Sequence, residues 1–327
     1  MGRTAVLGLG NIGTRHLTLL KDIGDDSPIG ISRRSSRRTE LNRLGYETAE
    51  TLTQALRIGA DKCIIATETG THISNIKEAI ECGMHILVEK PLGTDLDQSR
   101  FLPDVLNAEG ILLYVGCVLR FWESLNVFRA HLETIGPLHY VTVEHRSYMP
   151  NWRINRSYKE MYSALAKEGG VLLDLIHEID LTGWIFGWPK LVQGNVLNLG
   201  RLGINSDESV QLLCMSPVDV PIYISLDYLS NPPSRRVIAS GDKGTIEWDG
   251  VGNSVSVALS DQEVCKQEFD QPIKDAFLQQ SSAFLKACNG EANPRMADVY
   301  DGLRALSVCD AARKSSETRK EEVVELI

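Results

Sequence analysis

The sequence lacks the cysteine patterns of disulfide-rich and zinc-ribbon proteins. Its seven cysteines are spread along 327 residues, no two form a C-x-x-C pair, and their number is odd. Structural disulfides and zinc ribbons need paired cysteines at fixed spacings. We therefore interpret the cysteines as small buried side chains in a reducing cytoplasm. The histidines and cysteines together show no metal-ligand spacing, so no bound metal is expected.

Long apolar runs and an excess of positive charge are also missing. No run approaches the roughly 18 residues that a membrane-spanning helix needs. The opening residues, MGRTAVLGLG, go straight into a strand pattern without signal-peptide architecture. Lys and Arg number 34 against 43 Asp and Glu, which gives a net charge of −9, and such a surface does not attract polyanions. We expect a cytoplasmic protein with no nucleic-acid or membrane partner.

The first part of the chain, up to about residue 118, alternates short apolar strands with segments of helical spacing. This alternation predicts a parallel sheet with helices on both faces. The expected strands cover residues 4–9, 29–32, 63–67, 85–88 and 111–115, and the expected helices cover residues 14–22, 52–58, 71–82 and 95–108. Pro103 could interrupt the last of these helices.

From about residue 137, strands follow one another directly and are joined by turn signals. They are expected at residues 140–148, 192–199, 209–215, 222–229, 236–239, 244–248 and 255–259. Helical segments at about 158–186, 273–288 and 296–313 should cover one face of the resulting sheet. We predict an α/β chain with a doubly wound parallel domain at residues 1–118. A second α/β domain with an open, mostly antiparallel sheet follows at residues 119–327.

A glycine-rich loop follows the first expected strand and precedes the first expected helix. Gly8, Gly10 and Gly13, with Asn11 and Ile12 between them, form a G-x-G-x-x-G motif. The first glycine allows the tight turn, the second lets the backbone approach a pyrophosphate, and the third lets helix and strand pack closely. In this context the motif predicts a Rossmann dinucleotide-binding domain rather than a turn without a ligand.

The end of the second expected strand indicates which dinucleotide is bound. An NAD-binding domain usually places Asp or Glu there, whereas here Ser32 is followed by Arg33 and Arg34. Guanidinium groups form charge-assisted bonds with a 2′-phosphate, which a carboxylate would repel. We therefore predict a preference for NADP(H), with NAD(H) possible. The alternative is that the arginines only form a solvated, basic start of a helix.

Glu89, Lys90 and Pro91 follow the expected strand HILV. They should therefore lie at the carboxyl edge of the sheet, where doubly wound folds bind ligands. A lysine there can approach a nicotinamide ring and a substrate hydroxyl, and can take part in proton transfer. Pro91 could form a cis bond. The alternative is an ordinary surface turn with a Glu–Lys pair.

The segment GGVLLDLIHEID, from Gly169 to Asp180, reads mostly as a helix. Asp174 and His177 are three residues apart and should occupy neighbouring positions on one helix face. A histidine beside a carboxylate is held in one tautomer and is a better base. The alternative is a satisfied core histidine.

Together these motifs resemble the glucose–fructose oxidoreductase / inositol dehydrogenase (Gfo/Idh/MocA) family, and the resemblance covers nearly the whole chain. It is carried by GLGNIG, EKPLG, VGCVLRF (115–121), GGVLLDLIHEIDLTGWIFG (169–187), RRVIASGDKGTIEWDG (235–250) and the closing helix pattern (296–316). The resemblance implies oxidation of a sugar or cyclitol hydroxyl, or the reverse reduction. It implies His177 as acid/base, Lys90 and Asp174 as groups that position the reacting oxygen, and Glu89 near the cofactor.

Two positions depart from the pattern of many members of the family. Two residues separate Asp174 from His177 where many members have three, and Glu68 stands where many have a proline. That proline belongs to a T-P-x-x-x-H motif, in which Thr67 and His72 keep their places. We expect Thr67 and His72 at the cofactor site, together with Glu89 and Lys90.

The segment from Tyr148 to Ala164 resembles a branch of the family often found with biosynthesis of surface-polysaccharide and nonulosonic-acid sugars. Aromatic faces stack on sugar rings, and Arg can hold phosphate or carboxylate. The substrate-pocket candidates are Arg120, Trp152, Arg156, Tyr158 and Tyr162. The alternative is a surface loop with packing aromatic residues.

We therefore expect an NADP(H)-dependent dehydrogenase or reductase acting on a sugar, a sugar phosphate or a nucleotide-linked sugar. A non-catalytic NADP(H)-binding sensor or scaffold remains an alternative, as does a reductase of an imine or tetrapyrrole-like substrate. The exposed face of a large open sheet commonly needs a partner, so a homodimer or homotetramer through the second domain is expected.

Overall fold

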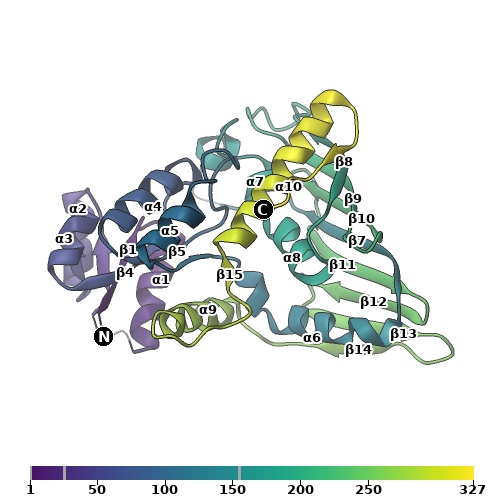
Figure 1. The fold of residues 1–327 in the computed structure, drawn as a ribbon, viewed down its shortest axis with the longest axis horizontal. Helices are drawn as coiled ribbons and strands as arrows, with labels where there is room; N and C mark the ends of the chain where they lie inside the picture. The colour runs from purple at the N-terminus through teal and green to yellow at the C-terminus, as the bar shows by residue number, and fades with distance from the viewer. Residues whose placement is uncertain (1, 25–26, 154–155) are drawn as a thin grey trace. The chain divides into compact units, whose positions relative to one another are not determined.

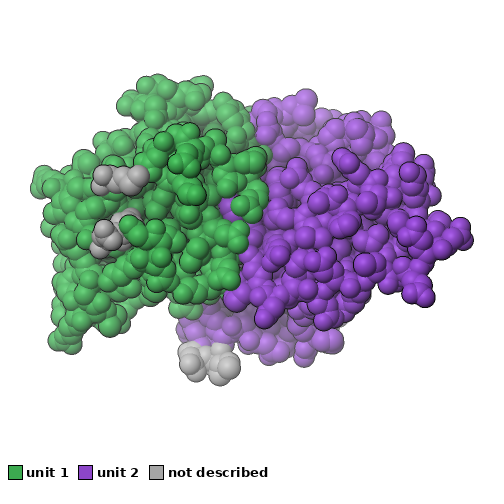
Figure 2. Space-filling model, turned by 90° about the horizontal axis from the view of Figure 1, so that it is seen from below, with its two compact units in different colours: residues 1–118, 273–303 green, residues 119–272, 304–327 purple. Residues whose placement is uncertain are grey.

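The computed structural model describes residues 2–24, 27–153 and 156–327. They fall into two compact units, which Figure 2 shows in different colours. The first unit comprises residues 1–118 and 273–303, and the second comprises residues 119–272 and 304–327. The boundary at residue 118 coincides with the expected one, but residues 273–303 were expected in the second domain.

Residues 273–303 group with the first unit because they pack on its first helix and extend its sheet. Phe277, in helix α9 (Ile273–Ala287), meets the ring of His16 edge-on, with 5.5 Å between the ring centroids. The guanidinium of Arg15 lies 4.8 Å from the centroid of the same phenyl ring. Strand β15 (Ala297–Asp298) pairs antiparallel with β6 (Leu113–Val115).

The described part of the first unit contains a seven-stranded sheet in the order β15-β6-β5-β4-β1-β2-β3, parallel except for β15. Its other strands are β1 (Arg3–Leu7), β2 (Ile29–Ile31), β3 (Glu47–Ala49), β4 (Ala60–Ile65) and β5 (His85–Val88). Its other helices are α1 (Asn11–Asp22), α2 (Ser35–Arg43), α3 (Leu52–Arg57), α4 (His72–Glu81) and α5 (Leu102–Glu109) (Figure 1). The central strands are buried along nearly their whole length, as expected when helices cover both faces. The predicted parallel sheet is confirmed.

The described part of the second unit contains a nine-stranded sheet in the order β14-β13-β12-β11-β7-β10-β9-β8-β16. Its neighbouring strands are antiparallel except for β7 and β10, which run parallel. The strands are β7 (Leu138–Arg146), β8 (Leu191–Leu197), β9 (Ser209–Met215), β10 (Pro221–Asp227), β11 (Ser234–Gly241), β12 (Gly244–Asp249), β13 (Ser254–Leu259), β14 (Cys265–Glu268) and β16 (Glu322–Val323). The predicted open, mostly antiparallel sheet is confirmed.

Helices α6 (Glu123–His131) and α8 (His177–Phe186) lie on one side of this sheet (Figure 1). Buried and exposed side chains alternate along β7 and β9, and this alternation explains which face of the sheet the helices cover. Val141, Val143 and Leu212 are fully buried, whereas Tyr140 and Leu213 on the opposite face are 43% and 49% exposed. The sheet therefore buries one face within its own unit and leaves apolar side chains on the other.

The expected helix at 158–186 is wrong as a continuous element. The chain there forms two short 3₁₀ turns, then α7 (Val171–Asp174), and then α8. Gly170 has a φ of 92°, which a helix interior does not adopt. Pro103 lies in the first turn of α5 and begins that helix instead of interrupting it, because an N-terminal helical residue needs no N–H partner.

Several short elements carry no apolar period and were not expected from the sequence. Helix α2 is almost wholly polar, and strands β15 and β16 have two residues each. Helix α10 (Val299–Thr318) extends beyond the expected range. Among the helices of the described ranges, none combines the length and apolarity that crossing a membrane requires.

Candidate active site

In the loop after β1, each of the three glycines is needed for a different physical reason. Gly8 has a φ of 91°, and a Cβ on it would lie 2.5 Å from the carbonyl oxygen of Ala66. A Cβ on Gly13 would lie 1.8 Å from the carbonyl oxygen of Gly8, whereas a Cβ on Gly10 would meet nothing within 4 Å. Gly8 and Gly13 are therefore required by the fold itself. Gly10 leaves open space where a ligand could approach the backbone.

Helix α1 begins directly after this open position. Its N-cap is Gly10, which offers no side-chain cap, so the first N–H groups of the helix have no side-chain acceptor there. Free N–H groups and the positive end of the helix dipole together favour a phosphate group. The loop thus fits the pyrophosphate of a dinucleotide.

The residues expected to bind the cofactor follow four neighbouring strands of the sheet. Gly8 follows β1, Ser32 follows β2, Thr67 lies beyond β4, and Glu89 follows β5. These strands are adjacent in the order β5-β4-β1-β2, and the strand order reverses between β1 and β4. The carboxyl ends at such a reversal form the ligand crevice of doubly wound sheets.

Arg33 and Arg34 are exposed beside Ser32. In the part of the chain that the structure describes, neither guanidinium has a hydrogen bond or an ion pair. The side chain of Arg38 instead donates to the carbonyl of Ser32 at 2.6 Å, and Arg37 donates to Thr14 Oγ1 at 2.9 Å. Arg37 and Arg38 thus brace the glycine loop and the end of β2, while Arg33 and Arg34 face solvent.

A buried histidine holds the turn that carries Lys90. His16 of α1 is fully buried, and its Nε2 lies 2.8 Å from Oε1 of Glu89. Its Nδ1 lies 3.4 Å from the hydroxyl of Ser281. The Lys90–Pro91 peptide bond is cis. Sequence reasoning missed His16, because its partners are 73 and 265 residues away along the chain.

His72 is 1% exposed and lies between two backbone carbonyls. Its Nδ1 is 2.7 Å from the oxygen of Pro91, and its Nε2 is 3.1 Å from the oxygen of Thr67. Burial lowers the pKa of His72, although the two carbonyls oppose that effect. A neutral imidazole has one N–H and donates to only one of them. The ring therefore lies between the segments that follow β4 and β5 and donates to one of them, and a direct contact with the cofactor stays a prediction.

The carboxylate of Asp174 accepts hydrogen bonds from three hydroxyl groups. Tyr162 donates at 2.8 Å, Ser163 at 2.7 Å and Tyr228 at 3.1 Å. Burial raises the pKa of Tyr228 well above its usual value, and the neighbouring Asp174 raises it further. The arrangement keeps Tyr228 as a neutral donor and ties the loop around Tyr162 to α7.

The sequence predicts Asp174 and His177 on one face of a single helix. In the structure they lie in two different helices. Asp174 is the last residue of α7 and His177 is the first residue of α8, with Leu175 and Ile176 between them. The two residues therefore flank a break between helices. They belong to the second unit, whereas Lys90 belongs to the first.

Glu178, next to His177, is a charged residue that sequence reasoning missed. It is 1% exposed, and Arg235 contacts its Oε1 through Nε at 2.7 Å and through Nη2 at 2.6 Å. Nδ1 of His145 lies 3.2 Å from its Oε2. Burial alone would raise the pKa of Glu178, but Arg235 and then His145 lower it to about 2. No local pattern in the sequence marks it, because its partners Arg235 and His145 lie on other elements.

The substrate candidates fall into two groups within the second unit. Trp152 lies edge-on to Tyr228, with 5.1 Å between centroids, so Trp152 and Tyr162 both border the Asp174 cluster. Arg120 is 2% exposed and forms two hydrogen bonds with Asp180, at 2.6 and 3.1 Å, which makes it part of a buried ion pair.

The two other substrate candidates contact the backbone. The hydroxyl of Tyr158 donates to the carbonyl of Leu202 at 3.0 Å, and the exposed Arg156 donates to the carbonyl of Glu160 at 2.7 Å. Tyr158 is therefore held in place by the following loop, whereas Arg156 lies at the surface.

The glycine loop at the switch of a parallel sheet, followed by an open antiparallel sheet, defines a two-domain, dinucleotide-binding oxidoreductase. Comparison with protein families agrees. The sequence model of the oxidoreductase family with an NAD-binding Rossmann fold, GFO_IDH_MocA, matches residues 2–117. The model of the GFO/IDH/MocA C-terminal domain matches residues 131–247. The chain belongs to the GFO/IDH/MocA oxidoreductase family and is an enzyme of that class, so the resemblance inferred from its motifs is confirmed.

Individual relatives match over the whole length. Myo-inositol 2-dehydrogenase of Thermotoga maritima is 26% identical over an alignment of 345 residues, which covers 98% of this chain and 99% of the relative. The structure of levoglucosan dehydrogenase in complex with NADH has a TM-score of 0.88 at 16% identity, covering 99% of each chain. The WlbA dehydrogenase from Bordetella pertussis, in complex with NADH and UDP-GlcNAcA, has a TM-score of 0.82 at 19% identity, covering 99% and 98%. These structures share the fold of this protein.

Proposed function

We propose that the protein transfers a hydride between NADP(H) and a hydroxyl- or keto-bearing carbon of a sugar, a sugar phosphate or a nucleotide-linked sugar. The observation that carries the proposal is that one chain combines two features. Its glycine loop has open space at Gly10, and His177 follows Asp174, whose carboxylate accepts hydrogen bonds from three hydroxyl groups. The named activities of the relatives, on inositol and on sugars, support the same substrate chemistry. The aromatic segment at 148–164 favours a sugar over an acyclic alcohol.

NADP(H) is the proposed cofactor. Gly8, Gly10, Asn11, Ile12 and Gly13 would hold its pyrophosphate at the N-terminus of α1. Ser32, Arg33 and Arg34 would hold the 2′-phosphate, since the end of β2 carries no carboxylate that would bind a ribose hydroxyl instead. When bound, the nicotinamide supplies the hydride chemistry. Thr67, His72, Glu89 and Lys90 are the proposed remainder of this site.

His177 is the proposed acid/base. It takes the proton of the reacting hydroxyl in the oxidation direction and returns it in the reduction direction. Lys90 is proposed to donate a hydrogen bond to the reacting oxygen. Asp174 positions the site through its contacts: its carboxylate is already held by three hydroxyls, so it fixes Tyr162, whose ring can then face the sugar. Trp152, Arg156 and Tyr158 are proposed sugar contacts, and Arg120 is proposed as a further pocket residue that is held by its ion pair with Asp180.

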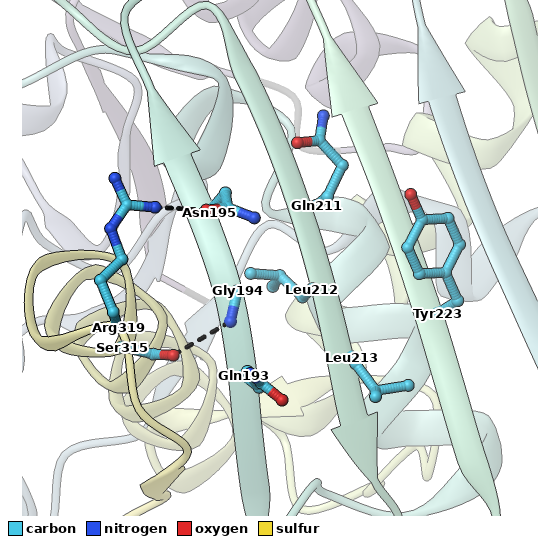
Figure 3. A pocket seen from close by; sticks show the side chains of 9 residues that line it. All are labelled: Gln193, Gly194, Asn195, Gln211, Leu212, Leu213, Tyr223, Ser315 and Arg319. Atoms are coloured by element: carbon cyan, nitrogen blue, oxygen red, sulfur yellow. Dashed lines mark hydrogen bonds between the residues drawn. The ribbon is translucent and has the colours of Figure 1, made fainter.

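We also propose that a second copy of the chain covers the open face of the nine-stranded sheet. Ile238, Thr142, Tyr223 and Leu213 lie in register across four neighbouring strands on that face. A hollow of about 260 Å³ opens on that face. Figure 3 shows the side chains of Leu213 and Tyr223 among those that line it. A Leu213→Glu variant should lower the mass measured by light scattering to that of the monomer, and an unchanged mass would contradict this interface.

The direct test follows nicotinamide absorbance with NADP⁺ and NAD⁺ in parallel. The panel holds free sugars, sugar phosphates, nucleotide-linked sugars and inositols. Turnover with one sugar class that is lost in Lys90→Met is the expected result. Silence across the panel, with NADPH still bound, would instead favour a non-catalytic sensor or an imine reductase.

A further inference from the structure

We propose that Glu178, held by Arg235 and His145, is a positioning residue that sets the charge beside His177 and fixes the start of α8. The proposal rests on the proposed function, in which His177 is the acid/base. Glu178 itself contacts neither substrate nor cofactor in this role, because its side chain is 1% exposed and faces the sheet.

The geometry ties Glu178 to two central strands of the nine-stranded sheet. Arg235 of β11 and His145 of β7 are directly paired across the two strands. Arg235 holds Oε1 through two nitrogens, at 2.6 and 2.7 Å, and Nδ1 of His145 lies 3.2 Å from Oε2. Each carboxylate oxygen thus has its own partner on a different strand. The first turn of α8, which also carries His177, is thereby anchored to the sheet.

The charged groups around the start of α8 include two ion pairs, and Glu178 of the first pair is the chain neighbour of His177. Arg235 from β11 and His145 from β7 face Glu178, and Asp174 of α7 precedes His177 by three residues. Further along α8, Asp180 is neutralised by Arg120 at 2.6 Å. A buried carboxylate paired in this way stays ionised throughout the pH range in which a histidine titrates. It therefore favours the protonated form of the neighbouring imidazole.

Replacing Glu178 and replacing Arg235 should shift the titration midpoint of His177 in opposite directions. Glu178→Gln removes the negative charge and leaves Arg235 uncompensated, so the titration midpoint of His177 should fall by roughly one pH unit. Arg235→Gln removes a positive charge and leaves His145 as the partner that keeps Glu178 ionised, so the titration midpoint of His177 should rise. A purely structural role predicts loss of stability in both variants without this opposition.

The experiment is a pH titration of the imidazole signals by NMR, with His177 assigned by comparison with His177→Gln. The chain has only seven histidines. The matched control is Arg236→Gln, since Arg236 is the next residue of β11, lies on the opposite face and is half exposed beside Glu247 at 3.6 Å. The control should leave the His177 midpoint unchanged.

Opposite shifts of the two midpoints support the proposal, and the limb of the kcat/KM profile that reports His177 should move with them. Unchanged midpoints, or shifts in the same direction, overturn it. If one variant does not fold, the other decides alone, because each has its own predicted sign. The NMR readout needs no turnover, so a wild-type protein that proves inactive on every sugar refutes the proposed function without affecting this test.

Discussion

Nε2 of His16 lies 2.8 Å from Oε1 of Glu89, and this pair joins the helix of the glycine loop to the turn that carries Lys90. The two residues are 73 positions apart in the chain. His16 is completely buried, and the side chain of Glu89 is 14% exposed. The contact couples the two parts of the first unit that the proposed function uses.

Replacing this histidine should destabilise the protein. His16→Leu leaves a nearly buried carboxylate without its partner, which should cost about 1–3 kcal/mol of unfolding free energy. Urea denaturation followed by circular dichroism measures it. The matched control is His139→Gln, at the exposed pair with Asp242, where we expect a change within about 0.5 kcal/mol. Equal effects at the two sites would argue against a structural role for the buried pair.

Substitutions of Gly13 and Gly10 should affect different properties of the protein. Gly13→Ala places a Cβ 1.8 Å from the carbonyl of Gly8, so we expect a large loss of thermal stability. Gly10→Ala meets no protein atom within 4 Å, so the melting temperature should stay near that of the wild type while NADPH affinity falls. Thermal melts and NADPH fluorescence titrations separate the two. If Gly10→Ala bound NADPH as tightly as the wild type, the assignment of the loop to the cofactor site would be contradicted.

Arg33 and Arg34 should determine the choice between the two dinucleotides. The double variant Arg33→Ala/Arg34→Ala should lose NADPH affinity by about tenfold or more, as expected when bonds to a charged phosphate are removed. NADH affinity should hardly change, because NADH lacks the 2′-phosphate. Titrations at two salt concentrations measure both. Arg43→Ala, an exposed arginine at the far end of α2, is the control. Parallel losses for both dinucleotides would contradict the assignment.

Replacing Lys90 or His177 should lower turnover far more than it lowers NADPH affinity. Lys90→Met and His177→Ala should each lower kcat by roughly 10²–10⁴-fold, the usual contribution of a positioned acid or base. NADPH affinity should change little, since neither residue is proposed to bind the adenosine part. Steady-state kinetics together with fluorescence titration distinguish the two effects. Near wild-type turnover in either variant would refute its role.

Stability at acid pH should depend on Glu178. Its pKa in the folded protein lies at about 2, below its ordinary value of 4.5. A depressed carboxyl pKa contributes stability above the ordinary value, and that contribution is lost as the pH falls toward 2. The unfolding free energy should therefore decline by a few kcal/mol over this window. In Glu178→Gln this decline should be shallower. Urea denaturation at a series of acid pH values would measure the unfolding free energy of both proteins. An identical dependence on pH in the two proteins would contradict the pairing.

The sequence by itself determined the class of fold and the positions of the motifs. Apolar strands alternating with amphipathic helices specify a parallel sheet because burial follows local periodicity, and G-x-G-x-x-G specifies its own turn by steric need. The motif residues could therefore be assigned to strand ends from local patterns alone. The break in the helix between Asp174 and His177 could not be assigned, because only Leu175 and Ile176 stand between them and neither residue type ends a helix.

The tertiary structure decided which distant residues meet. Residues 273–303 join the first unit because Phe277 packs on His16, a contact that no local pattern encodes. Glu178 meets Arg235, which follows it by 57 residues, only because α8 packs on β7 and β7 pairs with β11. Polar side chains carry no periodic signal, and their partners are chosen by strand pairing and burial. That is why the motifs could be read from the sequence, whereas the charges that surround them depended on the fold.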